Sequence, residues 1–114
     1  DKMKRYCQML DIPNDEELIA RYKEAHANVW SVIQEGIRTV GILDMQIYCV
    51  DNHLFMICDT VDDFDWAKDN ARLAALPQQA EWEAFVAECQ GCDPNAKSTE
   101  KWRLMDKIFQ LDKA

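Results

Sequence analysis

Residues 38–60 read RTVGILDMQIYCVDNHLFMICDT, and this stretch decides the fold. Its first part, from Arg38 to Val50, is rich in β-branched and apolar residues, which predicts a long strand. Asp51 and Asn52 follow, and their short polar side chains favour a tight turn. Leu54 to Thr60 is a second apolar run. The stretch therefore predicts two strands joined as a β-hairpin.

The segment before the hairpin predicts one strand and one long helix. Lys4 to Ile12 alternates weakly between apolar and polar residues, which is typical of a strand. Asn14 is a good N-cap, and a helix is expected from about Asp15 to Gln34 because its apolar residues recur with a helical period. Gly36 is expected to end this helix.

Two helical pieces and a last strand are expected after the hairpin. Val61 to Leu73 and Ala80 to Cys89 have helical spacing, and Pro77 separates them. Asn95 to Thr99 is a polar loop, and Trp102 to Leu111 alternates like a strand. The predicted order is therefore strand, helix, strand, strand, helix, strand.

This order is the split βαβ or ferredoxin-like pattern, an α+β fold in which helices cover one face of a four-stranded antiparallel sheet. A chain of 114 residues is expected to form a single domain over residues 1–114. The second and last predicted strands carry apolar residues at both odd-numbered and even-numbered positions, so both faces of the sheet are apolar. Two helical segments can cover only one of these faces. We therefore expect a second copy to cover the other face, giving a homodimer in the form of a dimeric α/β barrel. The alternative is an internal pocket covered by long loops.

The charge balance excludes several classes of partner. Lysine and arginine total 13 and aspartate and glutamate total 21, which gives a net charge of −8. Nucleic acids and anionic membrane surfaces need a basic stripe, which the sequence lacks. Its apolar runs are too short for a membrane-spanning helix, and no signal peptide is expected. A small neutral ligand fits this acidic surface better.

The cysteines do not suggest a disulfide framework, a metal site or a redox site. Their number is five, and an odd count is typical of reduced thiols in a cytoplasmic protein. Cys89 and Cys92 form a C-x-x-C pair, but this pair closes a predicted helix instead of preceding one, and no second pair accompanies it. Nucleotide-binding and serine-hydrolase motifs are also missing from the sequence.

The first predicted helix carries a candidate acid or base. Tyr22, His26 and Trp30 are spaced four residues apart and share its apolar face. A histidine there is either a core residue that bonds a backbone carbonyl or a residue that lines a pocket between helix and sheet. In a pocket, its ordinary pKa of about 6.5 suits proton transfer near neutral pH.

Other candidate site residues have both a structural and a functional interpretation. Asp44 and Asp59 interrupt apolar strands, where a carboxylate must be paired, must reach solvent or must bind ligand hydroxyls. Glu81 precedes Trp82 near a predicted helix start, where an acid is often only solvated. The four tryptophans, Trp82 among them, serve packing or stack on a sugar face.

Several of these segments, taken together, resemble the L-rhamnose mutarotase family. Tyr22-Lys23-Glu24-Ala25-His26, followed by Trp30, resembles the family's Y-x-x-x-H…W signature. Residues 41–48, GILDMQIY, resemble its second strand, and Glu81-Trp82 resembles the tryptophan site on its second helix. Residues 101–109 resemble its closing strand. The resemblance covers nearly the whole chain.

The resemblance implies a function and roles for particular residues. The family forms ferredoxin-like dimers that interconvert the α and β anomers of a 6-deoxyhexose, a monosaccharide, without cofactor or metal. It implies that His26 is the general acid and that Tyr22 and Trp82 bind the sugar. Glu81 stands where better-known rhamnose enzymes have tryptophan, and Met45 replaces a sugar-binding strand tyrosine. These departures make the chain similar to the branch described as type-2 L-fucose mutarotase, so the expected sugar is L-fucose or L-rhamnose.

Ring opening also needs a second proton-transferring group. A bound water, Tyr22, Asp44 and Glu81 are the candidates that the sequence leaves open. Two other functions remain: a non-catalytic ligand-binding or structural dimer, and a cofactor-free oxygenase of the same scaffold. A sugar site predicts a pocket with several convergent polar groups, and an oxygenase predicts a mostly apolar cavity. A structural dimer predicts no pocket near His26.

Overall fold

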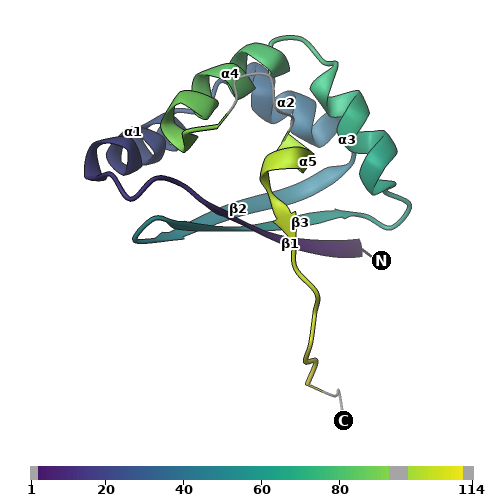
Figure 1. Cartoon of the computed structure of the whole chain (residues 1–114). Coiled ribbons are helices and arrows are strands. Elements are labelled where there is room, and N and C mark those ends of the chain that lie inside the picture. The colour runs from purple at the N-terminus through teal and green to yellow at the C-terminus, as the bar shows by residue number, and fades with distance from the viewer. Residues whose placement is uncertain (1–2, 93–97, 112–114) are drawn as a thin grey trace.

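Helices cover one face of a four-stranded antiparallel sheet (Figure 1). The computed structural model describes residues 3–92 and 98–111. The strands are β1 (Met3–Asp11), β2 (Ile42–Val50), β3 (His53–Val61) and β4 (Arg103–Leu104). The helices are α1 (Glu16–Ala27), α2 (Ser31–Thr39), α3 (Trp66–Ala74), α4 (Gln79–Gln90) and α5 (Ser98–Lys101). The strand order β2-β3-β1-β4 confirms the predicted ferredoxin-like α+β fold.

The hairpin forms as predicted, with one irregularity. Asp51 takes the left-handed conformation, with φ of 52°, at its turn. Ile42 pairs with Thr60, but Asp44 pairs with Asp59, so Leu43 is an extra residue that forms a β-bulge. After the bulge, successive side chains of β2 alternate between the two faces of the sheet in the opposite phase. The apolar residues at both odd-numbered and even-numbered positions of this strand are therefore explained in part by the bulge, and not by burial of both faces.

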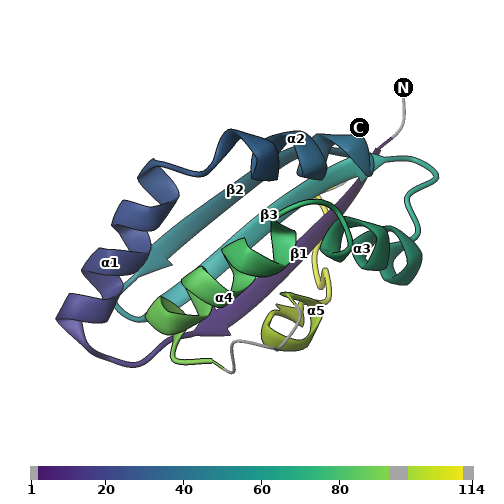
Figure 2. The ribbon, with the colours of Figure 1, turned by 90° about the horizontal axis from the view of Figure 1, so that it is seen from above.

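The long first helix that the sequence predicts is two helices. Helix α1 ends at Ala27, Trp30 is extended with ψ of 136°, and α2 begins at Ser31. This break redirects the chain, so that α1 packs against α4 while α2 packs on β2 (Figure 2). Gly36 does not end the helix, because it lies inside α2, where it is buried against the Gln79 side chain.

Helix boundaries elsewhere follow local capping chemistry. Asp15, and not Asn14, caps α1 by accepting hydrogen bonds from the backbone N–H groups of the first turn. Helix α3 begins at Trp66 behind an Asp65 cap, because Val61 still belongs to β3. Gly91, in the left-handed conformation, ends α4 as a C-cap.

The segment around α5 differs from the predicted polar loop. Residues 95–97 of that loop lie outside the described residues. Ser98 begins α5, so Thr99 is helical.

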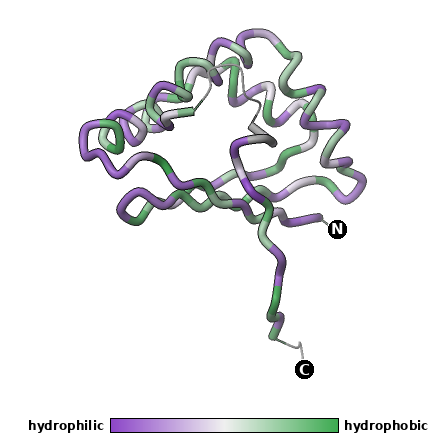
Figure 3. Tube along the Cα trace, viewed as in Figure 1, coloured by the Kyte–Doolittle hydropathy of each residue, from purple (hydrophilic) through white to green (hydrophobic). Residues whose placement is uncertain are grey.

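The last strand is much shorter than predicted. The strand expected over Trp102 to Leu111 is regular only at Arg103 and Leu104, and the backbone N–H of Met105 makes a last bond to Cys7. The tail, residues 105–111, then leaves the body of the protein and carries apolar segments with it (Figures 1 and 3). The far end of β1 that a longer β4 would reach, residues 3–5, is exposed and includes the charged Lys4 and Arg5, so it offers the tail little to pack against.

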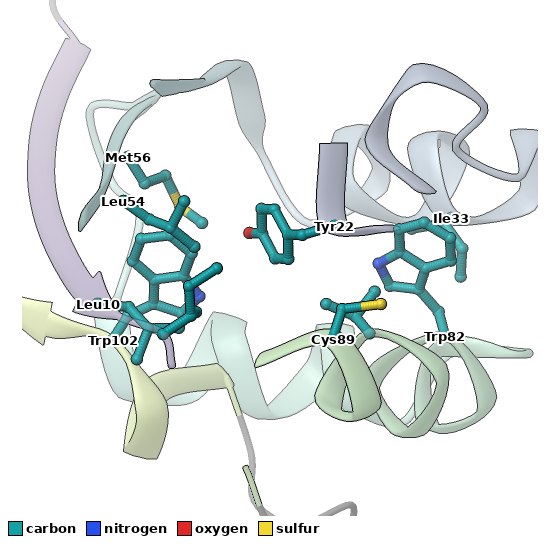
Figure 4. Close-up of a cluster of buried hydrophobic side chains, with 10 residues drawn as sticks. Leu10, Tyr22, Ile33, Leu54, Met56, Trp82, Cys89 and Trp102 are labelled. Atoms are coloured by element: carbon teal, nitrogen blue, oxygen red, sulfur yellow. The ribbon is translucent and has the colours of Figure 1, made fainter. Parts of the chain in front are cut away.

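The core lies between the helices and the sheet. Its main cluster combines apolar side chains from β1, β3, α1, α2 and α4 with the aromatic rings of Tyr22, Trp82 and Trp102 (Figure 4). Tyr22 stands between Trp82 on one side and the group of Trp102 and Leu54 on the other, and its hydroxyl points toward Trp102 (Figure 4). A buried phenol at this place puts one polar group inside an otherwise apolar cluster.

The outer face of the sheet, which the helices do not cover, contains the buried Asp59. Arg5 pairs with it through Nε–Oδ1 and Nη2–Oδ2 contacts of 2.7 and 3.0 Å. The Arg5 guanidinium lowers the pKa of Asp59 below its usual value, mainly through this hydrogen bond. Asp44, opposite Asp59, is exposed and accepts a hydrogen bond from Gln46.

Candidate active site

His26 and Tyr22 are one turn apart on α1 and stack on each other. Their ring centroids are 4.2 Å apart and their planes are 28° from parallel. The Nδ1 atom of His26 lies 2.9 Å from the backbone oxygen of Tyr22. A carbonyl oxygen only accepts hydrogen bonds, so Nδ1 carries the proton and Nε2 is the atom left to exchange protons.

Burial sets the acidity of both rings. It lowers the pKa of His26 below its usual value, although the backbone bond to Tyr22 and the negative charge of Glu83 act in the opposite direction. Burial raises the pKa of the Tyr22 phenol well above its usual value, against a smaller opposing effect of the Gln90 side chain. Tyr22 therefore stays a neutral hydroxyl, and burial favours the neutral form of His26.

A cavity of about 600 Å³ lies between the helices and the sheet and reaches both rings. This volume is typical of sites for small molecules. Most of its lining is apolar, from β2, β3, α3 and α4. Its polar lining consists of Gln8, Tyr22, His26, Asn70, Gln79, Glu83, Gln90 and Thr99. His26 therefore combines both interpretations of the sequence: it bonds a backbone carbonyl, and it lines a pocket.

A polar network connects one side of the cavity to α5. The side chain of Lys101 is only 3% exposed, and its Nζ lies 2.8 Å from Glu83 Oε1. The same Nζ donates a hydrogen bond of 2.7 Å to Gln90 Oε1. The Gln90 side chain also acts on Tyr22, where it lowers the pKa of the phenol. Tyr22, Glu83 and Gln90 therefore place polar groups on the lining of the cavity, and Lys101 joins the last two from behind.

Aromatic rings form the wall next to His26. Trp82 meets His26 and Trp30 edge to face, with centroid distances of 5.7 and 5.1 Å. Phe85 packs against both tryptophans. Because its neighbours cover it, Trp82 is buried in the wall and presents only part of its ring to the cavity.

The predicted site residues fall into three groups. Tyr22, His26, Met45 and Trp82 line the 600 Å³ cavity. Asp44 lines a second cavity of about 440 Å³, which shares His26 and Met45 with the first. Glu81 is exposed and is not among the residues that line either cavity.

The helical period explains why Glu81 is turned away. The positions of α4 that line the cavity include Gln79, Trp82, Glu83, Val86 and Gln90, which follow a three-and-four spacing. Glu81 lies off this stripe. The structure therefore brings Glu83 to the cavity in the place that the sequence analysis considered for Glu81.

Seven polar residues of the site were not singled out from the sequence: Gln8, Asn70, Gln79, Glu83, Gln90 and Thr99, which line the cavity, and Lys101, which pairs with Glu83. A signal existed for some of them. Gln8 occupies a strand position between Tyr6 and Leu10 where an apolar residue is expected. Glu83 and Gln90 are seven residues apart, which places them on one helix face. Lys101 follows a stretch with no periodicity, and the sequence contains no signal for it.

Metal ligands do not cluster in this part of the chain. Within residues 3–92 and 98–111, no group of three histidine, cysteine, aspartate or glutamate side chains is placed to hold a metal ion. None of the helices described there is long and apolar enough to cross a membrane.

Fold and site together define a ferredoxin-like α+β protein with a histidine and several polar groups on the lining of one cavity. The family model of L-rhamnose mutarotase matches residues 5–111. The chain therefore belongs to the L-rhamnose mutarotase family, whose activity is that of an anomer-interconverting isomerase.

Individual relatives agree with this assignment. The chain is 36% identical to a UPF0734 protein of Dictyostelium discoideum over 113 residues, which cover 96% of the chain and 90% of the relative. It is 33% identical to an L-fucose mutarotase of Xanthomonas campestris pv. campestris over 114 residues (98% and 91%). It is 26% identical to an L-rhamnose mutarotase of Burkholderia cenocepacia over 93 residues (80% and 84%).

A solved structure supports the fold. The L-rhamnose mutarotase of Formosa agariphila superposes with a TM-score of 0.72 at 17% identity, covering 96% of this chain and 99% of that one.

Proposed function

We propose that the protein interconverts the α and β anomers of a 6-deoxyhexose, with L-fucose as the preferred sugar and L-rhamnose as the alternative. The observation that carries the proposal is the position of His26, whose free Nε2 belongs to a ring that lines a cavity of sugar-binding size. Membership in the mutarotase family supports the reaction.

The preference for L-fucose rests on the relatives and on the cavity wall. The L-fucose mutarotase matches more of the chain, and at higher identity, than the L-rhamnose mutarotases do. Met45 lies on the wall beside His26, where it gives the sugar an apolar contact and no hydroxyl. Since the two sugars differ in hydroxyl configuration, such a wall residue contributes to discrimination between them.

The chemistry requires only proton transfers. Protonated His26 gives the Nε2 proton to the ring oxygen, the bond between this oxygen and the anomeric carbon breaks, and a base takes the proton of the anomeric hydroxyl. The aldehyde then rotates, and the same steps run in reverse on its other face. Each well-placed acid or base typically contributes about 10²–10⁴-fold to the rate.

The other proposed site residues bind the sugar. The Tyr22 hydroxyl, inside the cavity wall, hydrogen-bonds a sugar oxygen, and Trp82 packs against the apolar side of the ring. Asp44 accepts hydrogen bonds from hydroxyls that reach the second cavity. Glu81 lines neither cavity in this chain, and the proposal assigns it no contact.

The cavity also bears on the rival functions. A purely structural dimer predicts no pocket near His26, whereas a cavity is present there. A cofactor-free oxygenase predicts a mostly apolar lining, and much of the lining is indeed apolar. The polar side chains of Tyr22, Glu83 and Gln90 on this lining, the last two joined by Lys101, favour a ligand with several hydroxyl groups instead.

We also propose that two copies of the chain associate through the outer face of the sheet. Tyr48 and Val50 on this face are exposed, and so are the apolar side chains of the tail. Ile108, the most exposed of the latter, is 94% accessible. The proposal is supported by this number of exposed large apolar side chains, which favours an interface between proteins.

Saturation-transfer NMR on the anomeric protons of L-fucose and L-rhamnose tests the function. We expect the wild type to accelerate anomer exchange, more for L-fucose, and His26→Ala to lose most of the acceleration while staying folded. Wild-type protein without any acceleration would refute the proposal.

A further inference from the structure

Glu83 is the charged group of the cavity. Among the described residues that line it, Glu83 is the only aspartate, glutamate, lysine or arginine, and His26 is the only histidine. Its side chain is 28% exposed, so a ligand in the cavity can reach it. It lies next to Trp82 on the α4 stripe that faces the cavity, and α4 packs directly against the helix that carries His26.

Lys101 holds this carboxylate in place. The 2.8 Å contact uses Oε1 of Glu83, and the buried ammonium is fixed from its other side by the Gln90 amide oxygen. Burying an ammonium is costly unless it is paired, and a buried pair of this kind gives little net stability. The arrangement leaves Oε2 of Glu83 as the oxygen available to a ligand.

Ring opening needs two proton-transferring groups, and few are available in the cavity wall. The titratable side chains among its described lining residues are Tyr22, His26, Cys58 and Glu83. Burial raises the pKa of Tyr22 well above its usual value and that of Cys58 to about 12, so neither exchanges protons readily near neutral pH. His26 and Glu83 remain. The negative charge of Glu83 also acts on His26 and favours its protonated form.

We propose that Glu83, held by Lys101, is the base that takes the proton of the anomeric hydroxyl while His26 protonates the ring oxygen. This inference rests on the proposed function and supplies its second group. The O–H electron pair of the anomeric hydroxyl becomes the second bond of the aldehyde carbonyl, and the electrons of the broken C–O bond stay on the ring oxygen. On reclosure His26 recovers its proton from that oxygen, and Glu83 returns its proton to the aldehyde oxygen. No electrons are gained or lost.

The test is a comparison of Glu83→Gln with the wild type by saturation-transfer NMR on L-fucose and L-rhamnose, at several sugar concentrations. The matched control is Glu88→Gln, which removes the same charge from an exposed position of the same helix. We expect Glu83→Gln to lower kcat by about 10²–10⁴-fold with a change of only a few-fold in KM. We expect Glu83→Asp to keep more of the rate than Glu83→Gln, and Glu88→Gln to match the wild type.

A second variant separates loss of chemistry from loss of the fold. Glu83→Gln alone leaves the Lys101 ammonium buried without its anion, whereas Glu83→Gln combined with Lys101→Met removes both charges. We expect the double variant to give a wild-type circular dichroism spectrum and to remain as slow as Glu83→Gln.

The outcomes are distinct. Either variant with a wild-type kcat would overturn the role of Glu83 and leave the mutarotase function intact. A raised KM with an unchanged kcat would likewise overturn it, because it would show that Glu83 only binds the sugar. A wild type that does not accelerate anomer exchange would overturn the proposed function and this inference together.

Discussion

The imidazole of His26 lies over the ring of Tyr22, one helical turn away, and bonds the backbone oxygen of the same residue at 2.9 Å. One residue therefore sets both the orientation of the imidazole and the nitrogen that carries its fixed proton. The nitrogen left to exchange protons, Nε2, is chosen by the helix backbone and not by a carboxylate. Any replacement of Tyr22 keeps this backbone bond, so the effects of its side chain can be measured separately.

The first prediction concerns stability against pH. Burial lowers the pKa of His26 in the folded protein below its unfolded value, which is about 6.5. The unfolded chain therefore binds more protons as the pH falls below this value. The stabilising contribution is complete above about pH 6.5 and is lost as the pH falls through the lower, folded-state pKa.

Urea unfolding of the wild type and His26→Gln at pH 7.5 and pH 5.5 measures this effect. We expect the wild type to lose more of its free energy of unfolding than His26→Gln on acidification, because the variant has no titrating ring. The carboxylates common to both proteins cancel in the comparison. Equal losses would show that the pKa of His26 is not lowered by folding.

A second prediction separates the hydroxyl of Tyr22 from its ring. Tyr22→Phe keeps the stacking on His26 but removes the hydroxyl that the proposed function places against a sugar oxygen. A lost hydrogen bond of about 0.5–1.5 kcal/mol weakens sugar binding by roughly 2- to 12-fold. We expect KM to rise by this factor while kcat changes less. The kinetic measurement needs both sugars, and a kcat reduced as strongly as in His26→Ala would assign the hydroxyl to the chemistry instead.

The third prediction uses a double-mutant cycle on Glu83 and Lys101. Lys101→Met alone leaves the Glu83 carboxylate without its cationic partner at the cavity wall. We expect this change to lower the free energy of unfolding by roughly 2–3 kcal/mol, less than for a fully buried pair because Glu83 keeps some contact with water. Adding Glu83→Gln removes the stranded charge. We expect the double variant to be more stable than Lys101→Met in chemical denaturation. Additive losses would mean that the two side chains do not interact in solution.

The sequence predicts the first three strands and the helix face of His26 well because both depend on regular spacing. The hairpin turn and the alternation of β1 are local features, and the tyrosine and histidine of α1 share a face on any helix. The break after Ala27 could not be predicted, since Val29 and Trp30 continue the helical apolar pattern through it. Tertiary packing, and not local spacing, ends that helix.

Sequence spacing alone does not tell which of Glu81 and Glu83 faces the cavity. The two glutamates flank Trp82 symmetrically, so an inward-facing tryptophan does not distinguish them. The inward-facing polar side chains of Gln79 and Gln90 lie on the flank of Glu83, four residues before it and seven after it. That pattern is visible in the sequence, but it becomes informative only when the buried face of α4 is known. Lys101 completes the site from a segment remote in sequence, which no periodicity connects to α4.

The last prediction concerns the tail. Ile108 and Phe109 are adjacent, so they point to opposite sides of an extended chain, and they are 94% and 74% exposed. The unfavourable exposure is relieved when each tail packs on a second copy, next to the uncovered outer face of the sheet. We expect the protein to sediment as a dimer and Phe109→Asp to shift it toward monomer in analytical ultracentrifugation. Gln110→Asp adds the same charge to the next position of the tail and serves as the control that remains dimeric. A wild type that sediments as a monomer at micromolar concentration would refute the dimer and would leave the tail as an unpartnered apolar segment.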